Sequence, residues 1–355
     1  MAQKIDGRLA YADLLRAFAT LAVVVLHLAG SQMGAVAVSS SAWGVFNLYD
    51  GLVRWCVPVF VMLSGMFLLD PKRGLPLSKL LFHNALRILV CLLFWATVYA
   101  LAEFWAVGDL SIRALCVAAA SVLTGNTHYH LWFLYMILGL YLVTPVLRAF
   151  VRGASCGDFH WFFLLAFLFA SLLPTAFRLW PNATHIVKIW YDRLAVQTVL
   201  GYVGFYVAGY YLKEYTLGRL AEAVIYVLGV LGAVATVWGT RVLSLRAGGL
   251  DDTLYGYFSP NVVCFAVAVV VLFRYVLGVS DECSRRQRLG GVARIAFGVY
   301  LIHDLFLMLL RRFGVTTLSF APVVSVPVLA AGVFLCSLAV AWLISKIPFV
   351  GRWLT

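Results

Sequence analysis

Long apolar runs separated by short polar segments dominate the 355-residue chain. A helix of about 20 mostly apolar residues is long enough to cross the hydrocarbon core of a membrane. Runs of about this length lie at 14–29, 51–69, 81–106, 131–147, 160–179, 196–212, 220–238, 258–277, 294–311 and 322–345. The pattern predicts an all-α fold, a polytopic integral membrane bundle of about ten transmembrane helices that forms a single domain over 1–355.

One further apolar segment, 112–124, does not fit this series. Its sequence, IRALCVAAASVLT, is too short to cross the membrane comfortably, so we expect an interfacial or re-entrant helix there. The longer outer loops are expected near 30–50, 180–195 and 239–257. Their aromatic residues fit an interfacial belt, and stacking against sugar rings is the alternative interpretation.

Composition supports a membrane protein. Apolar residues make up 63% of the chain and charged residues 12%, whereas soluble domains have about 45–50% and about 25%. The net charge is +12. With the N-terminus inside, two thirds of the Lys and Arg residues fall on the inner side, which favours cytoplasmic termini at both ends. This bias accounts for the charge without nucleic acid, and an anionic cytosolic ligand is compatible with it.

The seven cysteines predict neither disulfides nor a metal site. No two of them form a C-x-x-C motif, and most lie inside apolar runs, where cysteine packs as a small apolar residue. The sequence also lacks a zinc signature, a Gly-rich phosphate loop and a G-x-S-x-G elbow. We therefore expect no metal and no nucleotide-binding fold of the soluble type.

The first apolar run carries a polar stripe made of Asp13, Arg16, Thr20 and His27. At about 100° per residue, His27 lies only about 20° around the helix from Arg16 and about 16–17 Å above it. Polar groups inside a membrane are costly, so a stripe on one face suggests function. In the alternative interpretation, Asp13 and Arg16 pair at the interface and His27 satisfies a neighbouring hydroxyl.

Two other runs carry histidines. His303 and Asp304 are adjacent in the ninth run, where an ionisable pair is expensive unless it faces a cavity. His130 stands at the outer end of the fourth run beside Trp132. Histidine can act as a general acid or base, and a satisfied histidine in the bundle interior is the alternative. The remaining histidines, His128 among them, lie near predicted interfaces and are less informative.

Arg87, at the start of the third run, belongs to a strongly cationic inner face. Guanidinium groups pair well with phosphate, so this face suits a phosphorylated cytosolic ligand. Attraction to anionic lipids of the inner leaflet explains the same charges equally well.

The chain resembles the membrane acyltransferase family 3, and within it the subgroup of the enterobacterial common antigen O-acetyltransferase. The stretches that carry the resemblance are YADLLRAFATLAVVVLH, PVFVMLSGMFLL, HLWFLYMILGLYLVTP and FGVYLIHDLF. By this resemblance, Arg16 and His27 match the essential arginine and histidine of the family, and His130 and His303 match its other recurrent histidines. Longer relatives carry a fused extracellular hydrolase-like domain, so a second catalytic step is expected to need a partner.

The resemblance implies transfer of an acyl group, usually acetyl from acetyl-CoA or another acyl-CoA, onto a hydroxyl of an envelope glycan or lipid-linked sugar at the inner membrane. We expect catalysis by His27, as base or transient acyl carrier, and by His303 and Asp304. Acyl-CoA is expected at Asp13, Arg16 and Arg87, and the acceptor at His130 and Trp132. A transporter or flippase and a non-catalytic binding module remain alternatives. The acceptor and the oligomeric state stay open.

Overall fold

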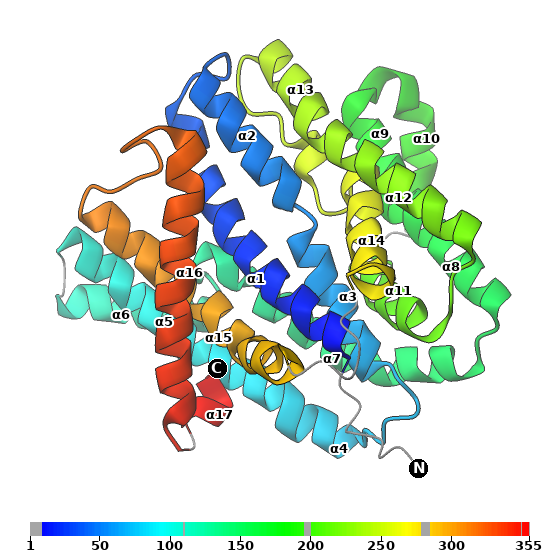
Figure 1. Ribbon diagram of the computed structural model, residues 1–355, viewed down its shortest axis with the longest axis horizontal. Coiled ribbons are helices and arrows are strands. Elements are labelled where there is room, and N and C mark those ends of the chain that lie inside the picture. Colours follow the sequence, from blue (N-terminus) through cyan, green and yellow to red (C-terminus); the bar gives the residue numbers. More distant parts are fainter. Residues whose placement is uncertain (1–8, 109–110, 195–199, 278–284, 349, 355) are drawn as a thin grey trace.

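The computed structural model describes residues 9–108, 111–194, 200–277, 285–348 and 350–354. These residues form helices and connecting turns, with no strand among them (Figure 1). Nine of the described helical segments are long and apolar enough to cross a membrane. The predicted all-α polytopic fold is confirmed.

The first half of the bundle contains α1 (Ala10–Ser31), η1 (Met33–Ala35), α2 (Ser41–Val53), α3 (Cys56–Leu68), α4 (Leu77–Lys79), η2 (Leu80–Ala85), α5 (Leu86–Val107), α6 (Ile112–Thr124), η3 (Tyr129–Leu131) and α7 (Trp132–Gly153). The second half contains α8 (Cys156–Phe167), η4 (Leu168–Leu172), α9 (Leu173–Leu179), α10 (Pro181–Leu194), α11 (Val203–Glu214), α12 (Arg219–Val234), η6 (Ala235–Gly239), α13 (Thr240–Ala247), η7 (Thr253–Tyr255), α14 (Pro260–Tyr275), α15 (Arg285–Arg312), α16 (Pro322–Lys346) and α17 (Val350–Leu354).

The three predicted outer loops are more helical than expected. In the predicted loop 30–50, all of 41–50 belongs to α2, which begins where the Ser40 side chain accepts a hydrogen bond from the backbone N–H of Trp43. A side chain of this kind satisfies an orphan donor of the first turn. Helix α10 lies within 180–195, and α13 lies within 239–257. Their polar residues suggested loops, yet polar residues can form a helix on either an exposed or a buried face: α10 has no buried residue, whereas Thr240 and Ser244 of α13 are buried.

The predicted span 196–212 corresponds to α11. Its 12 residues rise only about 18 Å, and residues 195–199 lie outside the described ranges. Among the described helices it is therefore not counted with the nine long candidates. The short segment 112–124 forms helix α6, as predicted, and its interfacial or re-entrant position stays a prediction.

Helix α1 runs through the centre of the bundle (Figure 1). It packs against α2, α3, α14, α15 and α16. Half of its most apolar window is buried, compared with 17% of the window in the span that contains α12. Helix α1 thus belongs to the interior of the bundle more than α12 does, and α12 presents most of its apolar surface to the surroundings.

Glycines allow α3 and α11 to pack backbone against backbone. A Cβ atom added at Gly65 would lie 1.8 Å from the Tyr206 carbonyl oxygen, and one at Gly209 would lie 1.9 Å from that of Met62. Small residues at a helix interface permit this close approach. It brings α11 directly behind α3, and α3 in turn forms one wall of the central cavity.

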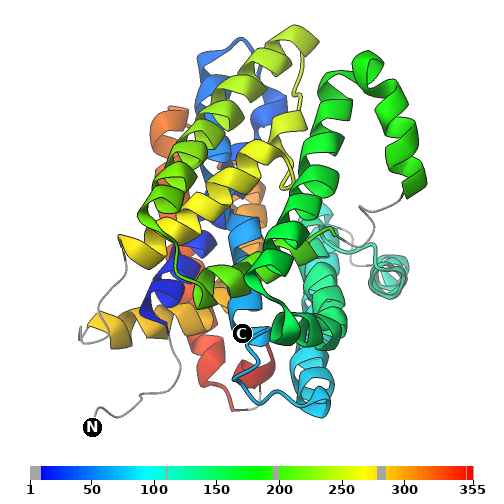
Figure 2. The ribbon, with the colours of Figure 1, turned by 90° about the vertical axis from the view of Figure 1, so that its right-hand side faces the viewer.

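The elements divide between two ends of the bundle. The first turn of α1, α4 and α17 lie toward one end, and the beginning of α2 and α13 lie toward the other (Figures 1 and 2). At the first end, burial opposes ionisation of Asp70, but hydrogen bonds from Lys213 and from the backbone N–H of Lys72 lower its pKa. This end therefore holds paired charges as well as a basic surface.

Candidate active site

A cavity of about 400 Å³ lies between α1, α3, α5, α7 and α15. Arg16 and His27 of α1 both line it, whereas Asp13 and Thr20, the other two residues of the predicted polar stripe, do not. The other polar residues of the lining are Ser64, Arg87, His130, Trp132, Tyr141, Tyr257, Arg294 and Tyr300. Helix α1 is uninterrupted from Ala10 to Ser31, so Arg16 and His27 remain about 16–17 Å apart along its axis.

Arginines mark the part of the cavity near the beginning of α1. Arg16 lies 3.9 Å from the buried carboxylate of Asp13, and its guanidinium lies 5.8 Å from the centre of the Phe67 ring. Arg87 lines the same cavity, 5.9 Å above the Phe297 ring. Aromatic faces attract guanidinium groups. These contacts hold permanent positive charge beside the cavity.

Histidines from three distant segments meet near the other end of α1. The His27 ring stacks on the His303 ring of α15, with centroids 5.1 Å apart. The His130 ring of η3 lies 5.3 Å from His303 and 6.4 Å from His27. Both His130 and His303 are almost completely buried. This arrangement brings together His27, His130 and His303, which the sequence singled out separately.

The nitrogens of His303 and His130 differ in their partners. His303 Nδ1 lies 2.6 Å from the Tyr300 carbonyl oxygen, so Nδ1 carries the proton and Nε2 is an acceptor. The buried Nε2 atoms of His303 and His130 have no hydrogen-bond partner within the described ranges. Buried polar atoms are nearly always satisfied. Of the two histidines, His130 lines the cavity and His303 does not, so only the His130 nitrogen is placed beside a space that a ligand could occupy.

Asp304 is connected to His27 through Tyr129. The Tyr129 hydroxyl donates to Asp304 Oδ1 at 2.8 Å and lies 3.2 Å from His27 Nδ1. The Asp304 side chain is fully buried, and the Arg311 guanidinium lies 3.7 Å from its other oxygen. Asp304 does not line the cavity itself; it supports a histidine that does.

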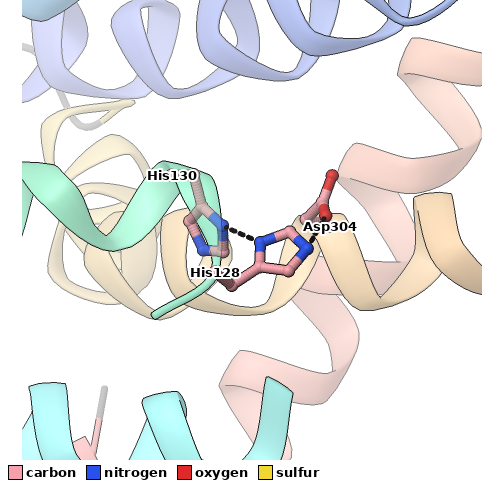
Figure 3. Close-up of side chains that lie close together, drawn as sticks. All are labelled: His128, His130 and Asp304. Atoms are coloured by element: carbon pink, nitrogen blue, oxygen red, sulfur yellow. Dashed lines mark hydrogen bonds and ion pairs between the residues drawn. The ribbon is translucent and has the colours of Figure 1, made fainter. Parts of the chain in front are cut away.

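His128 belongs to the same group, although its position in the sequence made it less informative. Its Nε2 lies 3.2 Å from Asp304 Oδ2, and its Nδ1 lies 2.9 Å from His130 Nδ1 (Figure 3). Burial lowers the pKa of His128 and the Asp304 carboxylate opposes this only in part, which favours the neutral ring. His128 received little weight from the sequence because helical periodicity does not show that the residues before η3 bring its side chain against Asp304.

Three of these residues also have the chemistry of metal ligands. One atom each from His128, His130 and Asp304 lie within 4.8 Å of one another. Two imidazoles and a carboxylate are a common ligand set for zinc and other divalent ions. His128 Nδ1 and His130 Nδ1 are hydrogen-bonded to each other, and His128 Nε2 lies at ion-pair distance from Asp304 Oδ2. The expectation that the protein uses no metal stays a prediction.

A second buried ion pair, missed in the sequence, lies on α2. The Asp50 carboxylate is 2.5 Å from Arg54 Nε, and the Arg54 guanidinium lies 4.1 Å from the centre of the Tyr255 ring. The spacing of four residues on a helix is the signal that could have revealed this pair. The aromatic and hydroxyl-rich sequence around it suggested a loop instead.

Aromatic side chains line the cavity near the histidines. Trp132 stacks on Tyr257, with ring centroids 6.0 Å apart and planes inclined by 22°. Both residues line the cavity, and Tyr202 packs against Trp132 from another side. Stacked rings offer a flat apolar surface with polar edges. Trp132 therefore presents such a surface to the cavity, and its role in acceptor binding stays a prediction.

The predicted site residues thus fall into two groups. Those that line the cavity are Arg16, His27, Arg87, His130 and Trp132. Those that pack against the lining residues are Asp13, His303 and Asp304. The roles assigned to all eight stay predictions.

These features define a membrane-embedded protein with a charged and histidine-containing cavity inside its helical bundle. A family model described as an acyltransferase domain, that of acyltransferase family 3, matches residues 9–346, and the chain belongs to this family. It is a multi-pass membrane acyltransferase. Neither a curated protein nor a solved structure matches the chain significantly.

Proposed function

We propose that this acyltransferase moves an acyl group, acetyl in the first instance, from cytosolic acyl-CoA to a hydroxyl of an envelope glycan, a lipid-linked sugar or a small molecule. The observation that carries the proposal is a single cavity lined by both Arg16 and His27. The first residue suits a phosphorylated donor and the second suits proton transfer to or from a hydroxyl.

The donor would enter from the arginine-lined end of the cavity. Phosphate oxygens of acyl-CoA accept charge-assisted hydrogen bonds from guanidinium groups such as those of Arg16 and Arg87. The pantetheine arm would then extend along α1 toward His27. The rise of about 16–17 Å between Arg16 and His27 is within reach of that arm when it is extended.

Acyl transfer then requires that one proton move from the acceptor hydroxyl to His27, and from His27 to the departing CoA. His27 removes the proton of the acceptor hydroxyl while the oxygen attacks the thioester carbonyl carbon. The carbon–sulfur bond breaks, and the His27 imidazolium returns the proton to the departing CoA thiolate. The products are an ester and free CoA, with no net uptake of protons. Histidine suits this reaction because its ring can both accept and release a proton near neutral pH.

The acceptor would occupy the histidine end. A sugar can stack on Trp132 and Tyr257, which line the cavity together. The unpartnered Nε2 of His130 would accept a hydrogen bond from a sugar hydroxyl. Together with the resemblance to the enterobacterial common antigen O-acetyltransferase subgroup, these features favour a carbohydrate of the cell envelope as acceptor.

This mechanism implies an orientation at the inner membrane with both termini cytoplasmic. Acyl-CoA is a cytosolic metabolite, so the arginine end would face the cytoplasm. The first turn of α1, α4 and α17 all lie toward that end of the bundle (Figure 2). The excess of Lys and Arg in the predicted inner segments supports the same orientation.

The test is release of CoA by the purified protein in detergent or liposomes. Acetyl-CoA is supplied with and without a panel of hydroxyl acceptors, including envelope glycan extracts, and His27→Ala serves as the matched control. We expect acceptor-dependent CoA release that the control lacks. Acetyl-CoA binding without turnover by the wild type would favour the non-catalytic module. Movement of an unmodified solute across the liposome, without CoA release, would favour a transporter.

A further inference from the structure

Asp304 lies behind the cavity lining, yet it is linked to His27 by two hydrogen-bond distances through Tyr129. We propose that Asp304, acting through the Tyr129 hydroxyl, is the positioning residue that holds His27 in the tautomer protonated at Nδ1. Its Nε2 then carries the lone pair that removes the acceptor proton. The inference rests on the proposed function, in which His27 is the general base.

The Tyr129 hydroxyl has a single proton and lies between Asp304 and His27. This proton is donated to Asp304 Oδ1, at 2.8 Å. The hydroxyl oxygen can then act only as an acceptor toward His27 Nδ1, which lies 3.2 Å away. A proton must therefore stand on His27 Nδ1 for this contact to be a hydrogen bond. In a neutral imidazole the other nitrogen, Nε2, is then unprotonated.

The direction of the Tyr129 hydrogen bond follows from the chemistry of Asp304. An ionised carboxylate accepts hydrogen bonds and donates none. The Arg311 guanidinium lies 3.7 Å from Asp304 Oδ2. His128 Nε2 lies 3.2 Å from the same oxygen. Asp304 is thus an acceptor approached by a hydroxyl, an imidazole and a guanidinium, and the hydroxyl proton of Tyr129 has one favourable direction.

The two histidines drawn in Figure 3 adjoin this group. His128 Nε2 lies 3.2 Å from Asp304 Oδ2, an ion-pair contact, and this oxygen has no hydrogen-bond partner within the described residues. His128 Nδ1 lies 2.9 Å from His130 Nδ1, so one of these two nitrogens donates and the other accepts. The tautomer assigned to His27 therefore follows from Tyr129 and Asp304 Oδ1 alone.

The arrangement follows the logic of a Ser-His-Asp triad, in which a buried carboxylate holds the histidine in the correct tautomer. Here a tyrosine hydroxyl stands between the carboxylate and the imidazole. In an Asp304→Asn variant, the amide can donate to the Tyr129 oxygen, so the hydroxyl proton turns toward His27 Nδ1. His27 would then carry its proton on Nε2 and could not act as the base.

The experiment measures kcat and KM for acetyl-CoA-dependent transfer in three variants: Tyr129→Phe, Asp304→Asn and the double variant. Tyr129 is 52% exposed in the described structure, so loss of its hydroxyl is not expected to disturb packing. We expect kcat to fall about tenfold in Tyr129→Phe, the scale of one lost hydrogen bond. In Asp304→Asn it should fall by about 10²–10⁴-fold, as when a triad carboxylate is replaced by an amide. KM for acetyl-CoA should change less than about threefold in both.

The double variant supplies the readout that a structural role would not produce. If Asp304 acts on His27 through Tyr129, replacing Asp304 in the Tyr129→Phe background should lower kcat by less than about threefold further. Independent losses that multiply in the double variant would overturn the proposal. Near wild-type kcat in Tyr129→Phe would also overturn it, even where Asp304→Asn fails to fold.

Matched controls carry the same chemical changes outside this group. Tyr135→Phe removes a hydroxyl from an exposed residue of α7, and Asp192→Asn replaces the carboxylate of an exposed ion pair on α10. Both should keep wild-type kcat. Failure of this inference is separable from failure of the proposed function: activity in His27→Ala would contradict the function itself. Loss of activity in His27→Ala with wild-type kcat in Tyr129→Phe would contradict only the inference.

Discussion

The two ends of the central cavity are built from different chemistry. Near the beginning of α1, the guanidinium groups of Arg16 and Arg87 lie over aromatic rings. Near the other end, His27, His130 and His303 form contacts that depend on which nitrogen holds a proton. The difference suggests that binding of an anion and transfer of a proton are separated along one helix.

The two ends also differ in how the chain supplies them. Arg16 and His27 come from one helix, and their common face follows from helical geometry alone. The group around His27 requires η3 and α15 as well, which are more than 100 residues away in sequence. An anion-binding end can tolerate small displacements, because charge acts over a distance. Proton transfer requires hydrogen-bond contact.

The largest effect is expected from the histidine end. His27→Gln keeps a side chain of similar polarity, but an amide cannot take up the acceptor proton. We expect transfer to fall about a hundredfold or more, the scale of a lost general base, while acetyl-CoA binding and thermal stability are kept. Steady-state CoA release, binding of acetyl-CoA and thermal melting measure the three quantities. A well-folded variant that transfers at near wild-type rate would show that this histidine is structural.

The next effect concerns Arg148, a basic residue that stabilises the fold and does not line the cavity. Arg148 is buried and donates to the carbonyl oxygens of Leu68 and Arg73, at 2.8 and 2.7 Å. Arg148→Ala leaves both carbonyls without this donor and should cost about 2–3 kcal/mol of stability. Arg152→Ala, at an exposed position of the same helix, is the control. Equal melting temperatures for the two variants would refute this assignment.

A smaller effect is expected at the arginine end. Arg16→Ala should raise the dissociation constant for acetyl-CoA about tenfold, since it removes a charge-assisted contact to phosphate. At saturating donor, kcat should stay within about threefold of wild type. Affinity should also weaken as salt is raised, because ions screen exposed charge pairs. Arg246→Ala, an exposed arginine of α13, is the control. Salt-insensitive binding that is unchanged in Arg16→Ala would contradict the donor site.

The smallest effect is expected for the aromatic surface. Trp132→Ala should raise KM for the acceptor by about three- to tenfold, the scale of a lost aromatic contact, and leave acetyl-CoA affinity unchanged. Trp105→Ala, at an exposed position of α5, serves for comparison. If Trp132→Ala weakened binding of acetyl-CoA and not of the acceptor, the positions of donor and acceptor in the cavity would have to be exchanged in the proposed mechanism.

Much of the architecture could be predicted because a membrane imposes simple rules on sequence. Apolar length locates the long helices, and the 3.6-residue period places Arg16 and His27 on one face. Helix α2 was missed because Asn47 and Asp50 are polar in sequence. In the structure both are buried, and each finds a partner from the same or a neighbouring helix. Whether a polar residue is satisfied is a property of its surroundings.

The amino-acid sequence by itself determined a multi-pass helical protein and one helix with a polar face that joins an arginine to a histidine. Only the tertiary structure decided which side chains of other segments contact that face. Local periodicity describes one helix at a time, whereas Tyr129 and Asp304 reach His27 through packing of segments distant in the chain. The turn that carries His128 inward has no periodic signal at all, so its contact with Asp304 follows from the packed bundle alone.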